Sequence, residues 1–233
     1  MSSSGESSAD FLAAGRKLFS RPCRFERVAA DVDGLPPAGP PEIAFVGRSN
    51  VGKSSLVNAL TGRRTLARAS HTPGRTQQLA FFDLGGVLRL VDTPGYGFAA
   101  IAKDQAAAAR ALTREYLCRR GPLIRVFLLV DGRHGLKDSD EEMMAMLDEA
   151  AASYAIVLTK RDEVKEAEAA ARRQGVLSRA RAHRAAYPEV FFASARTGEG
   201  IADLRGHVAE ALSGRIGAER RALGARPEKA RPD

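Results

Sequence analysis

The 233-residue sequence has few cysteines, only short apolar runs and no internal repeat. Its two cysteines, Cys23 and Cys118, cannot build a disulfide framework or a cysteine-based metal site, so we interpret them as free thiols in a reducing cytosol. Purely apolar runs are short, as at residues 126–130, which argues against a helix that spans a bilayer. The N-terminus lacks both a basic leader and an apolar core, so we expect no secretory signal.

The composition is that of a globular protein with an excess of positive charge. Hydrophobic residues make up 44% and charged residues 27%, which excludes a fully disordered or fibrous chain. The length suits one α/β domain or two small domains. The formal net charge is +8, and arginine outnumbers lysine by 29 to 7. An acidic partner such as nucleic acid would explain this excess, but the Ala/Arg bias of a GC-rich genome explains it equally well.

Hydrophobic patterning predicts one α/β domain between two loose ends. Residues 1–22 are Ser-rich without periodicity, so we predict disorder there, and residues 35–41 form a Pro-rich linker after a short strand at 23–29. Further strands are predicted at 43–47, 77–84, 87–91, 123–130, 154–158 and 190–193, the second and third joined by a hairpin turn at Gly85 and Gly86. Helices are predicted at 53–60, 103–118, 139–151, 166–186 (with a break near Gly175) and 201–212.

This alternation predicts an α/β fold of three layers. A mostly parallel, six-stranded sheet would carry helices on both faces. The domain would span residues 23–213, and residues 214–233 would form a basic, flexible tail.

The strongest local signal lies at residues 47–54. These residues fit the pattern G-x-x-x-x-G-K-[ST]: Gly47, Arg48, Ser49, Asn50, Val51, Gly52, Lys53 and Ser54. The segment lies between a predicted strand and a predicted helix, so backbone N–H groups and the helix N-terminus would face phosphate groups. We expect Lys53 to reach the β- and γ-phosphates and Ser54 to ligate Mg²⁺. The alternative, a glycine-rich turn without a ligand, does not explain this strand-to-helix context.

Three further motifs follow predicted strands. They are Asp92, Thr93, Pro94 and Gly95; Thr159, Lys160, Arg161 and Asp162; and Ser194, Ala195 and Arg196. Ligands of open α/β sheets bind at the carboxyl ends of the strands. There Asp92 would lie near the metal, the Gly95 N–H near the γ-phosphate, and Asp162 would accept the N1–H and N2–H₂ of guanine, a donor pair that adenine lacks.

The third and fourth motifs would complete a base site. The stem of Lys160 would lie over the base, and a backbone N–H at residues 194–196 would meet guanine O6. Each motif alone also fits an ordinary turn or loop. Four such motifs in order at four strand ends favour a guanine-nucleotide site over a P-loop ATPase or a nucleotide kinase.

With these motifs the chain resembles the translation-factor-related P-loop GTPases and, within them, the EngB family of ribosome-assembly GTPases. The resemblance covers about residues 24–212 and is carried by GRSNVGKSSLVNAL, the segment 67–77, DTPGYGFA and TKRD. It implies a Ras-like P-loop GTPase fold and a Mg²⁺-dependent GTPase. It implies further nucleotide contacts at Ser55, Gly74, Arg75, Thr76 and Gln77.

The resemblance also implies roles for individual residues. Thr76 and Ser54 would be direct Mg²⁺ ligands, and Asp92 would hold the ion through water. Lys53, Thr76 and Gly95 would act on the γ-phosphate, with two switch loops at residues 66–78 and 95–105. Tyr96 follows Gly95, where Ras-type enzymes carry a water-orienting Gln, so we predict slow intrinsic hydrolysis.

Further expectations concern ions and partners. Related GTPases with an Asn at the position of Asn50 bind K⁺ beside the phosphates; a loop-capping role is equally compatible. The resemblance implies a cytoplasmic, monomeric bacterial protein that acts late in large (50S) ribosomal subunit assembly, with a historical link to cell division and septation. The partners would be rRNA and ribosomal proteins of the precursor, not DNA. The alternative is a guanine-nucleotide sensor with negligible turnover that bridges cell-division partners.

Two clusters of arginine would serve such an RNA partner through phosphate contacts, or would be solvated surface. The first is Arg172, Arg173, Arg179, Arg181 and Arg184, and the second, at the first switch, is Arg63, Arg64, Arg68 and Arg75.

Overall fold

The computed structural model describes residues 8–63, 66, 78–97 and 103–224. Its strands are β1 (Cys23–Ala29), β2 (Glu42–Gly47), β3 (Leu79–Leu84), β4 (Leu88–Asp92), β5 (Leu123–Asp131), β6 (Tyr154–Thr159) and β7 (Ala186–Phe192). Its helices are α1 (Ser8–Phe19), α2 (Lys53–Thr61), α3 (Lys103–Arg119), α4 (Asp138–Glu149), α5 (Glu166–Ala180) and α6 (Ile201–Gly224), with a 3-10 turn, η1 (Arg161–Glu163). The predicted α/β fold is confirmed.

The strands form one sheet in the order β1-β3-β4-β2-β5-β6-β7. Five neighbouring strands pair in parallel, in the order β4, β2, β5, β6 and β7. Strand β3 is antiparallel to both β4 and β1. The sheet therefore has seven strands and not the six predicted. The added strand is β1, which was predicted as a separate short strand and pairs with the outer edge of β3.

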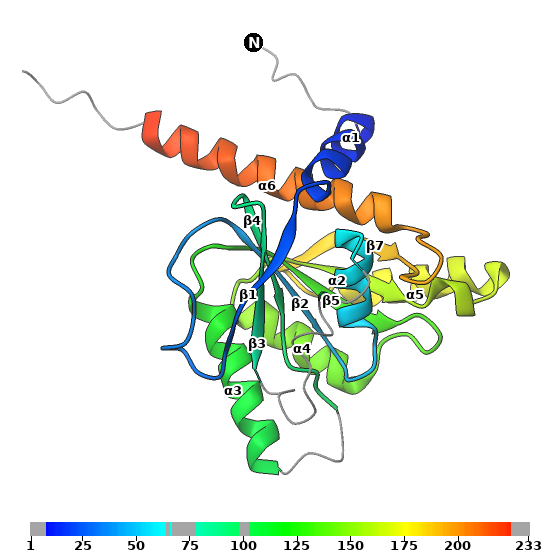
Figure 1. Cartoon of the computed structure of the whole chain (residues 1–233). Coiled ribbons are helices and arrows are strands. Elements are labelled where there is room, and N and C mark those ends of the chain that lie inside the picture. Colours follow the sequence, from blue (N-terminus) through cyan, green and yellow to red (C-terminus); the bar gives the residue numbers. More distant parts are fainter. Residues whose placement is uncertain (1–7, 64–65, 67–77, 98–102, 225–233) are drawn as a thin grey trace, which may run out of the picture.

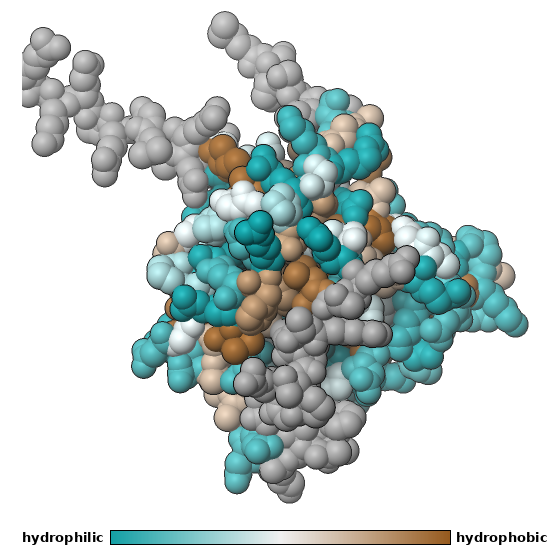
Figure 2. All heavy atoms as spheres, in the orientation of Figure 1, coloured by the Kyte–Doolittle hydropathy of each residue, from teal (hydrophilic) through white to brown (hydrophobic). Residues whose placement is uncertain are grey.

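Helices cover both faces of the sheet (Figure 1). Every residue of β2 and of β6 is buried, as expected for strands covered on both sides. One core lies under α1, α2 and α6, where Phe45 and Phe127 stack with ring centroids 5.5 Å apart. The other core lies under α3, α4 and α5. On the described part of the face in Figure 2, hydrophilic side chains predominate, with smaller hydrophobic patches between them.

The two chain ends differ from the prediction. Disorder predicted for residues 1–22 is wrong for residues 8–19, which form α1 and pack along α6. Gly15 makes this packing close, because a Cβ there would lie 2.5 Å from the carbonyl carbon of Arg205. The tail predicted at 214–233 is helical as far as Gly224, within α6. Residues 1–7 and 225–233 lie outside the described residues.

Smaller differences concern turns and helix ends. The predicted hairpin is confirmed, with Gly85 and Gly86 at positive φ values of 60° and 71°. Its loop has three residues, 85–87, and not two, because Leu84 pairs with Leu88. The predicted break near Gly175 does not occur, and α5 ends at Ala180 instead of residue 186. No helix within the described ranges is long and apolar enough to cross a membrane.

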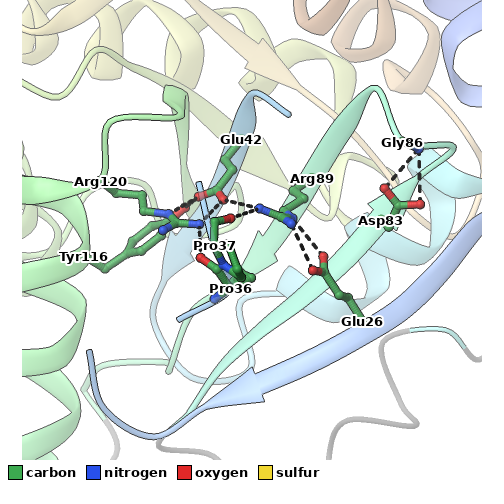
Figure 3. A network of polar contacts seen from close by, with 9 residues as sticks. All are labelled: Glu26, Pro36, Pro37, Glu42, Asp83, Gly86, Arg89, Tyr116 and Arg120. Atoms are coloured by element: carbon green, nitrogen blue, oxygen red, sulfur yellow. Dashed lines mark hydrogen bonds and ion pairs between the residues drawn. The ribbon is translucent and has the colours of Figure 1, made fainter. Parts of the chain in front are cut away.

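A buried polar network ties the start of β2 to its surroundings (Figure 3). Glu42 is fully buried and its carboxylate accepts hydrogen bonds from Arg120, Tyr116 and Arg89. Arg89 also forms an ion pair with Glu26, at 2.8 Å. Backbone carbonyls of the Pro-rich segment 35–41 accept further bonds from both arginines. The network thereby fixes this segment, which has no regular structure, against β2 and the end of α3.

Candidate functional site

The turn between β2 and α2 has the backbone geometry of a phosphate-binding loop. Gly52 (φ 107°) and Asn50 (φ 62°) adopt positive φ values. Gly47 passes so close to β5 that a Cβ would lie 2.7 Å from the carbonyl oxygen of Leu129. Helix α2 begins at Lys53, so its N-terminus opens onto this turn. Free N–H groups and the helix dipole favour an anion here.

Lys53 is buried in this loop, and its hydrogen bonds to the described residues all go to backbone carbonyls. Its Nζ donates to the carbonyl oxygens of Gly47 (3.0 Å) and Arg48 (3.2 Å), and the residue is 9% exposed. Burial lowers the pKa of Lys53, and nearby Asp92 partly counters this effect. A phosphate group would supply the counter-charge that two neutral carbonyls do not.

Ser54 and Asp92 lie side by side next to Lys53. The hydroxyl of Ser54 donates to Oδ2 of Asp92 at 3.0 Å, although the two residues are 38 positions apart. Asp92 is 2% exposed and ends β4. A hydroxyl and a carboxylate at the mouth of a phosphate loop are the hard oxygen donors that Mg²⁺ prefers, so this pair fits the expected ion. Thr76, the third expected ligand, lies outside the described residues, as do Gly74, Arg75 and Gln77.

The segment after β4 runs against the phosphate loop. Thr93 is anchored to β2, since its hydroxyl donates to the carbonyl of Phe45 at 2.9 Å, and Pro94 directs the chain onward. Gly95 then lies so close to the loop that a Cβ would be 2.9 Å from both Lys53 Nζ and Ser49 Oγ. Such a Cβ would also lie 3.0 Å from the backbone Cα of Ser49, so glycine is favoured where the sequence places the γ-phosphate contact.

A cavity of about 250 Å³ lies beside the loop, between the ends of β6 and β7. It is lined by residues of the loop and of the two predicted base motifs: Val51, Gly52, Ser55, Leu56, Thr159, Lys160, Asp162, Glu163, Ala193, Ala195 and Arg196. Thr159 joins the two parts, because its hydroxyl donates to the carbonyl of Val51 at 2.7 Å. The structure thus brings together the motifs that the sequence places more than a hundred residues apart.

Asp162 is fixed at the cavity by residues of the fourth motif. Its Oδ1 accepts a hydrogen bond from the hydroxyl of Ser194, and its Oδ2 contacts Arg196 Nε at 2.7 Å. These bonds, that of Ser194 first, lower the pKa of Asp162, so the carboxylate is ionised at neutral pH. Of the backbone N–H groups at residues 194–196, one of which we expected near guanine O6, that of Arg196 bonds to Ser194 Oγ at 3.2 Å, so the same hydroxyl also orders this turn.

Sequence reasoning missed two residues that support the site. Asp131, at the end of β5, holds Lys160 Nζ at 2.9 Å, and Lys160 itself has a positive φ of 58°. Asp140, in the first turn of α4, accepts a hydrogen bond from the hydroxyl of Tyr96 at 2.8 Å. A polar residue that ends an apolar strand was a signal for Asp131; no sequence signal pointed to Asp140.

Two arginines of the first cluster form ion pairs with acidic side chains of the same chain. Arg179 forms an ion pair with Glu141 at 2.5 Å and Arg173 one with Glu189 at 3.2 Å. Arg181 and Arg184 are exposed. Of the second cluster, Arg63 is described and exposed, and the other three lie outside the described residues.

Comparisons with known proteins agree on one family. Residues 42–160 match the model of a family described as 50S ribosome-binding GTPase. "Probable GTP-binding protein EngB" of Rhodopseudomonas palustris (strain TIE-1) is 52% identical over 198 residues, which are 84% of this chain and 92% of that protein. The protein of the same name from Bradyrhizobium diazoefficiens is 51% identical over 209 residues, 89% of this chain and 96% of that protein.

Solved structures show the same fold. A crystal structure of a probable GTP-binding protein EngB superposes with a TM-score of 0.60 at 23% identity, over 74% of this chain and 98% of that one. Era, crystallised with nucleotides of 16S ribosomal RNA, superposes with a TM-score of 0.56 at 18% identity, over 74% of this chain and 56% of that one.

Proposed function

The chain belongs to the EngB family of GTP-binding proteins and is a GTPase, and from this premise we propose that it is a slow, Mg²⁺-dependent switch in late assembly of the large ribosomal subunit. The observation that carries the nucleotide part is the convergence of Lys53, the Ser54–Asp92 pair and Asp162 along one edge of the sheet. The match to a family described as 50S ribosome-binding supports the ribosomal part.

In the proposed complex each motif binds one part of GTP. The loop 47–52 and Lys53 hold the β- and γ-phosphates, and Gly95 contributes its N–H to the γ-phosphate. Ser54 and Thr76 would bind Mg²⁺ directly and Asp92 through water; the ion would neutralise charge on the phosphate oxygens. Asp162 reads guanine in the cavity, where Ser194 and Arg196 hold its carboxylate.

We propose slow intrinsic hydrolysis because no Gln follows Gly95. Tyr96 occupies that position, and its hydroxyl is bound to Asp140 of α4. A K⁺ ion beside Asn50 would supply positive charge to the transition state; Asn50 is exposed on the loop, with its backbone already at φ 62°. Hydrolysis measured in K⁺ and in Na⁺ buffers tests this role, and equal rates in the two buffers, both with and without ribosomal particles, would rule it out.

Base recognition is tested by Asp162→Asn. The variant replaces one acceptor by a donor that faces guanine N1–H, so we expect at least a ~10-fold loss of GTP affinity, since hydrogen bonds to charged groups contribute about 1.5–3 kcal/mol each. Xanthine nucleotides, which present an acceptor at that edge, should bind better. The control is Glu168→Gln, at an exposed position of α5, which should leave GTP affinity unchanged. Full GTP affinity in the Asp162 variant would show that the assignment is wrong.

Ribosomal docking is tested by sedimentation with purified 50S particles and their precursors. We expect co-sedimentation with a non-hydrolysable GTP analogue, release with GDP, and a steep loss of binding with salt, because the chain carries a charge of +8 and exposed arginines. Equal binding in both nucleotides, or no response to salt, would contradict the proposal. Era, a structural neighbour that matches over 56% of its own length, was crystallised with nucleotides of 16S ribosomal RNA, and this supports a ribosomal partner.

A cytoplasmic location and a role in normal cell division and septation complete the proposal. A block in subunit assembly would reduce protein synthesis and so delay division. The second candidate, a sensor that bridges cell-division partners with negligible turnover, predicts no stimulation by ribosomal particles. Multiple-turnover hydrolysis with and without these particles distinguishes the two.

A further inference from the structure

Tyr96 is attached to the phosphate loop through its backbone. Its carbonyl oxygen accepts the Ser49 N–H at 2.9 Å, and its own N–H points to the Gly47 carbonyl at 3.4 Å. These bonds form an isolated parallel bridge between Arg48 and Tyr96, one residue beyond Gly95. The backbone position of Gly95 is therefore set from one side by Thr93, which is fixed to β2, and from the other side by Tyr96.

The side chain of Tyr96 is attached to a different element. Its hydroxyl donates to Oδ1 of Asp140 at 2.8 Å, and Oδ2 of Asp140 accepts the Lys137 N–H at 2.9 Å. Asp140 is 1% exposed and is part of the capping box that starts α4. Burial raises the pKa of the Tyr96 phenol well above its usual value, so the hydroxyl keeps its proton and remains a donor. One residue thus connects the phosphate loop with the first turn of α4.

Other polar links of α4 in this region are weaker. Tyr96 also lines a shallow cleft between α3 and α4. Two ion pairs join the helices around this cleft, Arg110 to Glu142 at 3.2 Å and Arg114 to Glu149 at 2.9 Å. All four side chains are more than half exposed, and exposed pairs contribute about 0–1 kcal/mol. A hydrogen bond to a buried carboxylate is stronger and is not screened by water. The Tyr96–Asp140 bond is therefore the firm connection from α4 to the segment that carries Gly95.

We propose that Tyr96 is a positioning residue for GTP: by bonding to Asp140 it holds the Gly95 N–H where only a γ-phosphate can use it, and so sets the preference for GTP over GDP. The inference rests on the proposed contact between Gly95 and the γ-phosphate. GDP lacks that phosphate group, so loss of the bond should leave GDP affinity nearly unchanged. Tyr96 thus occupies the sequence position at which Ras-type enzymes carry a Gln. In this proposal it positions the Gly95 N–H and does not orient the attacking water.

The test is Tyr96→Phe, which keeps the ring and removes only the donor. Affinities for a non-hydrolysable GTP analogue and for GDP are measured by calorimetry with Mg²⁺. We expect the analogue to bind about 10-fold more weakly, about 1.4 kcal/mol, and GDP to change by less than about twofold. Equal weakening of both nucleotides, or no change in either, would overturn the proposal.

Tyr116→Phe is the matched control for a purely structural effect. Tyr116 also donates to a buried carboxylate, Glu42 at 3.0 Å, in the network at the start of β2. It should lower thermal stability without changing the ratio of the two affinities. Gly95→Ala separates the premise from the inference. If it leaves the ratio unchanged, the γ-phosphate assignment of Gly95 fails; if it changes the ratio and Tyr96→Phe does not, the role of Tyr96 alone is refuted.

Discussion

The two ends of strand β2 bury opposite charges in opposite ways. At its start, Glu42 is fully buried and both of its oxygens accept hydrogen bonds from Arg120, with Tyr116 and Arg89 completing the set (Figure 3). Beyond its end, at the start of α2, Lys53 is also buried, but within the described part of the chain its ammonium group donates to two neutral carbonyls and has only the carboxylate of Asp92 nearby. One strand therefore separates a charge neutralised within the protein from a charge that a ligand can neutralise.

This difference separates residues whose charges stabilise the fold from residues whose charges are available to a ligand. A buried charge whose partners are all internal stabilises the fold only as a complete set, because removal of one partner leaves the others desolvated. A buried cation without a full set of partners costs stability until an anion binds. The carboxyl ends of the strands are therefore the binding edge, and the amino ends are the structural edge.

The largest effect is expected at the structural edge. Glu42→Gln removes the charge between two arginines, and breaking a buried pair costs about 3–5 kcal/mol, so we expect a loss of about 4 kcal/mol in the free energy of unfolding. GTP affinity of the folded variant should stay within about twofold of wild type. Urea unfolding and nucleotide titration measure the two quantities. Glu115→Gln, which breaks the exposed pair with Arg119, is the control and should cost less than about 0.5 kcal/mol.

The opposite pattern is expected at the binding edge. Lys53→Met should weaken GTP binding by about 100-fold, about 2.7 kcal/mol, because the charged contact to the phosphates is lost. The free energy of unfolding without nucleotide should be equal to that of wild type or higher, since a desolvated cation is removed. Lys17→Met, at an exposed position of α1, should change neither GTP affinity nor the free energy of unfolding. A large loss of stability in the Lys53 variant would show that the comparison between the two edges is false.

A smaller effect is expected at His207, which lies between the two edges on α6. Its ring packs against Tyr187 and Phe191 at centroid distances of 4.4 and 4.9 Å, and burial, together with Arg125, lowers its pKa to about 4. Glu210, 3.2 Å away, does not reverse this shift because its side chain is 44% exposed. The folded protein therefore keeps this buried group neutral.

The sign of the pH dependence follows from that shift. In the unfolded chain His207 is protonated below about pH 6.5, whereas in the folded chain it is protonated only below about pH 4. The free energy of unfolding therefore falls as the pH drops from 6.5 to 4. We expect a loss of about 2 kcal/mol between pH 7.5 and pH 5, measured by urea unfolding. His207→Phe should remove most of this dependence, and His134→Gln, at an exposed site, should retain it. The same slope in all three proteins would mean that another group titrates.

Local pattern was sufficient where one interaction dominates. Strand β1 begins and ends as predicted, and α2 begins at the predicted Lys53, directly after Gly52. The order of strands and motifs was also readable, since parallel strands must place their ends along one edge. Helix α1 was missed although Phe11, Leu12, Leu18 and Phe19 recur at helical spacing, because the Ser-rich composition was given more weight and the partner helix α6 is distant in sequence.

The sequence by itself determined the α/β order and the strand-to-helix turn at residues 47–53, and it predicted a chemistry for each motif, because these depend on residues that are close along the chain. The tertiary structure alone decided which distant groups meet. It decided that Ser194 and Arg196 hold Asp162, that Asp131 holds Lys160, that Tyr96 bonds to Asp140, and that the charge of Glu42 is matched internally. Such contacts depend on distance and burial in three dimensions, and a residue's charge is either neutralised or left for a ligand only once its neighbours are in place.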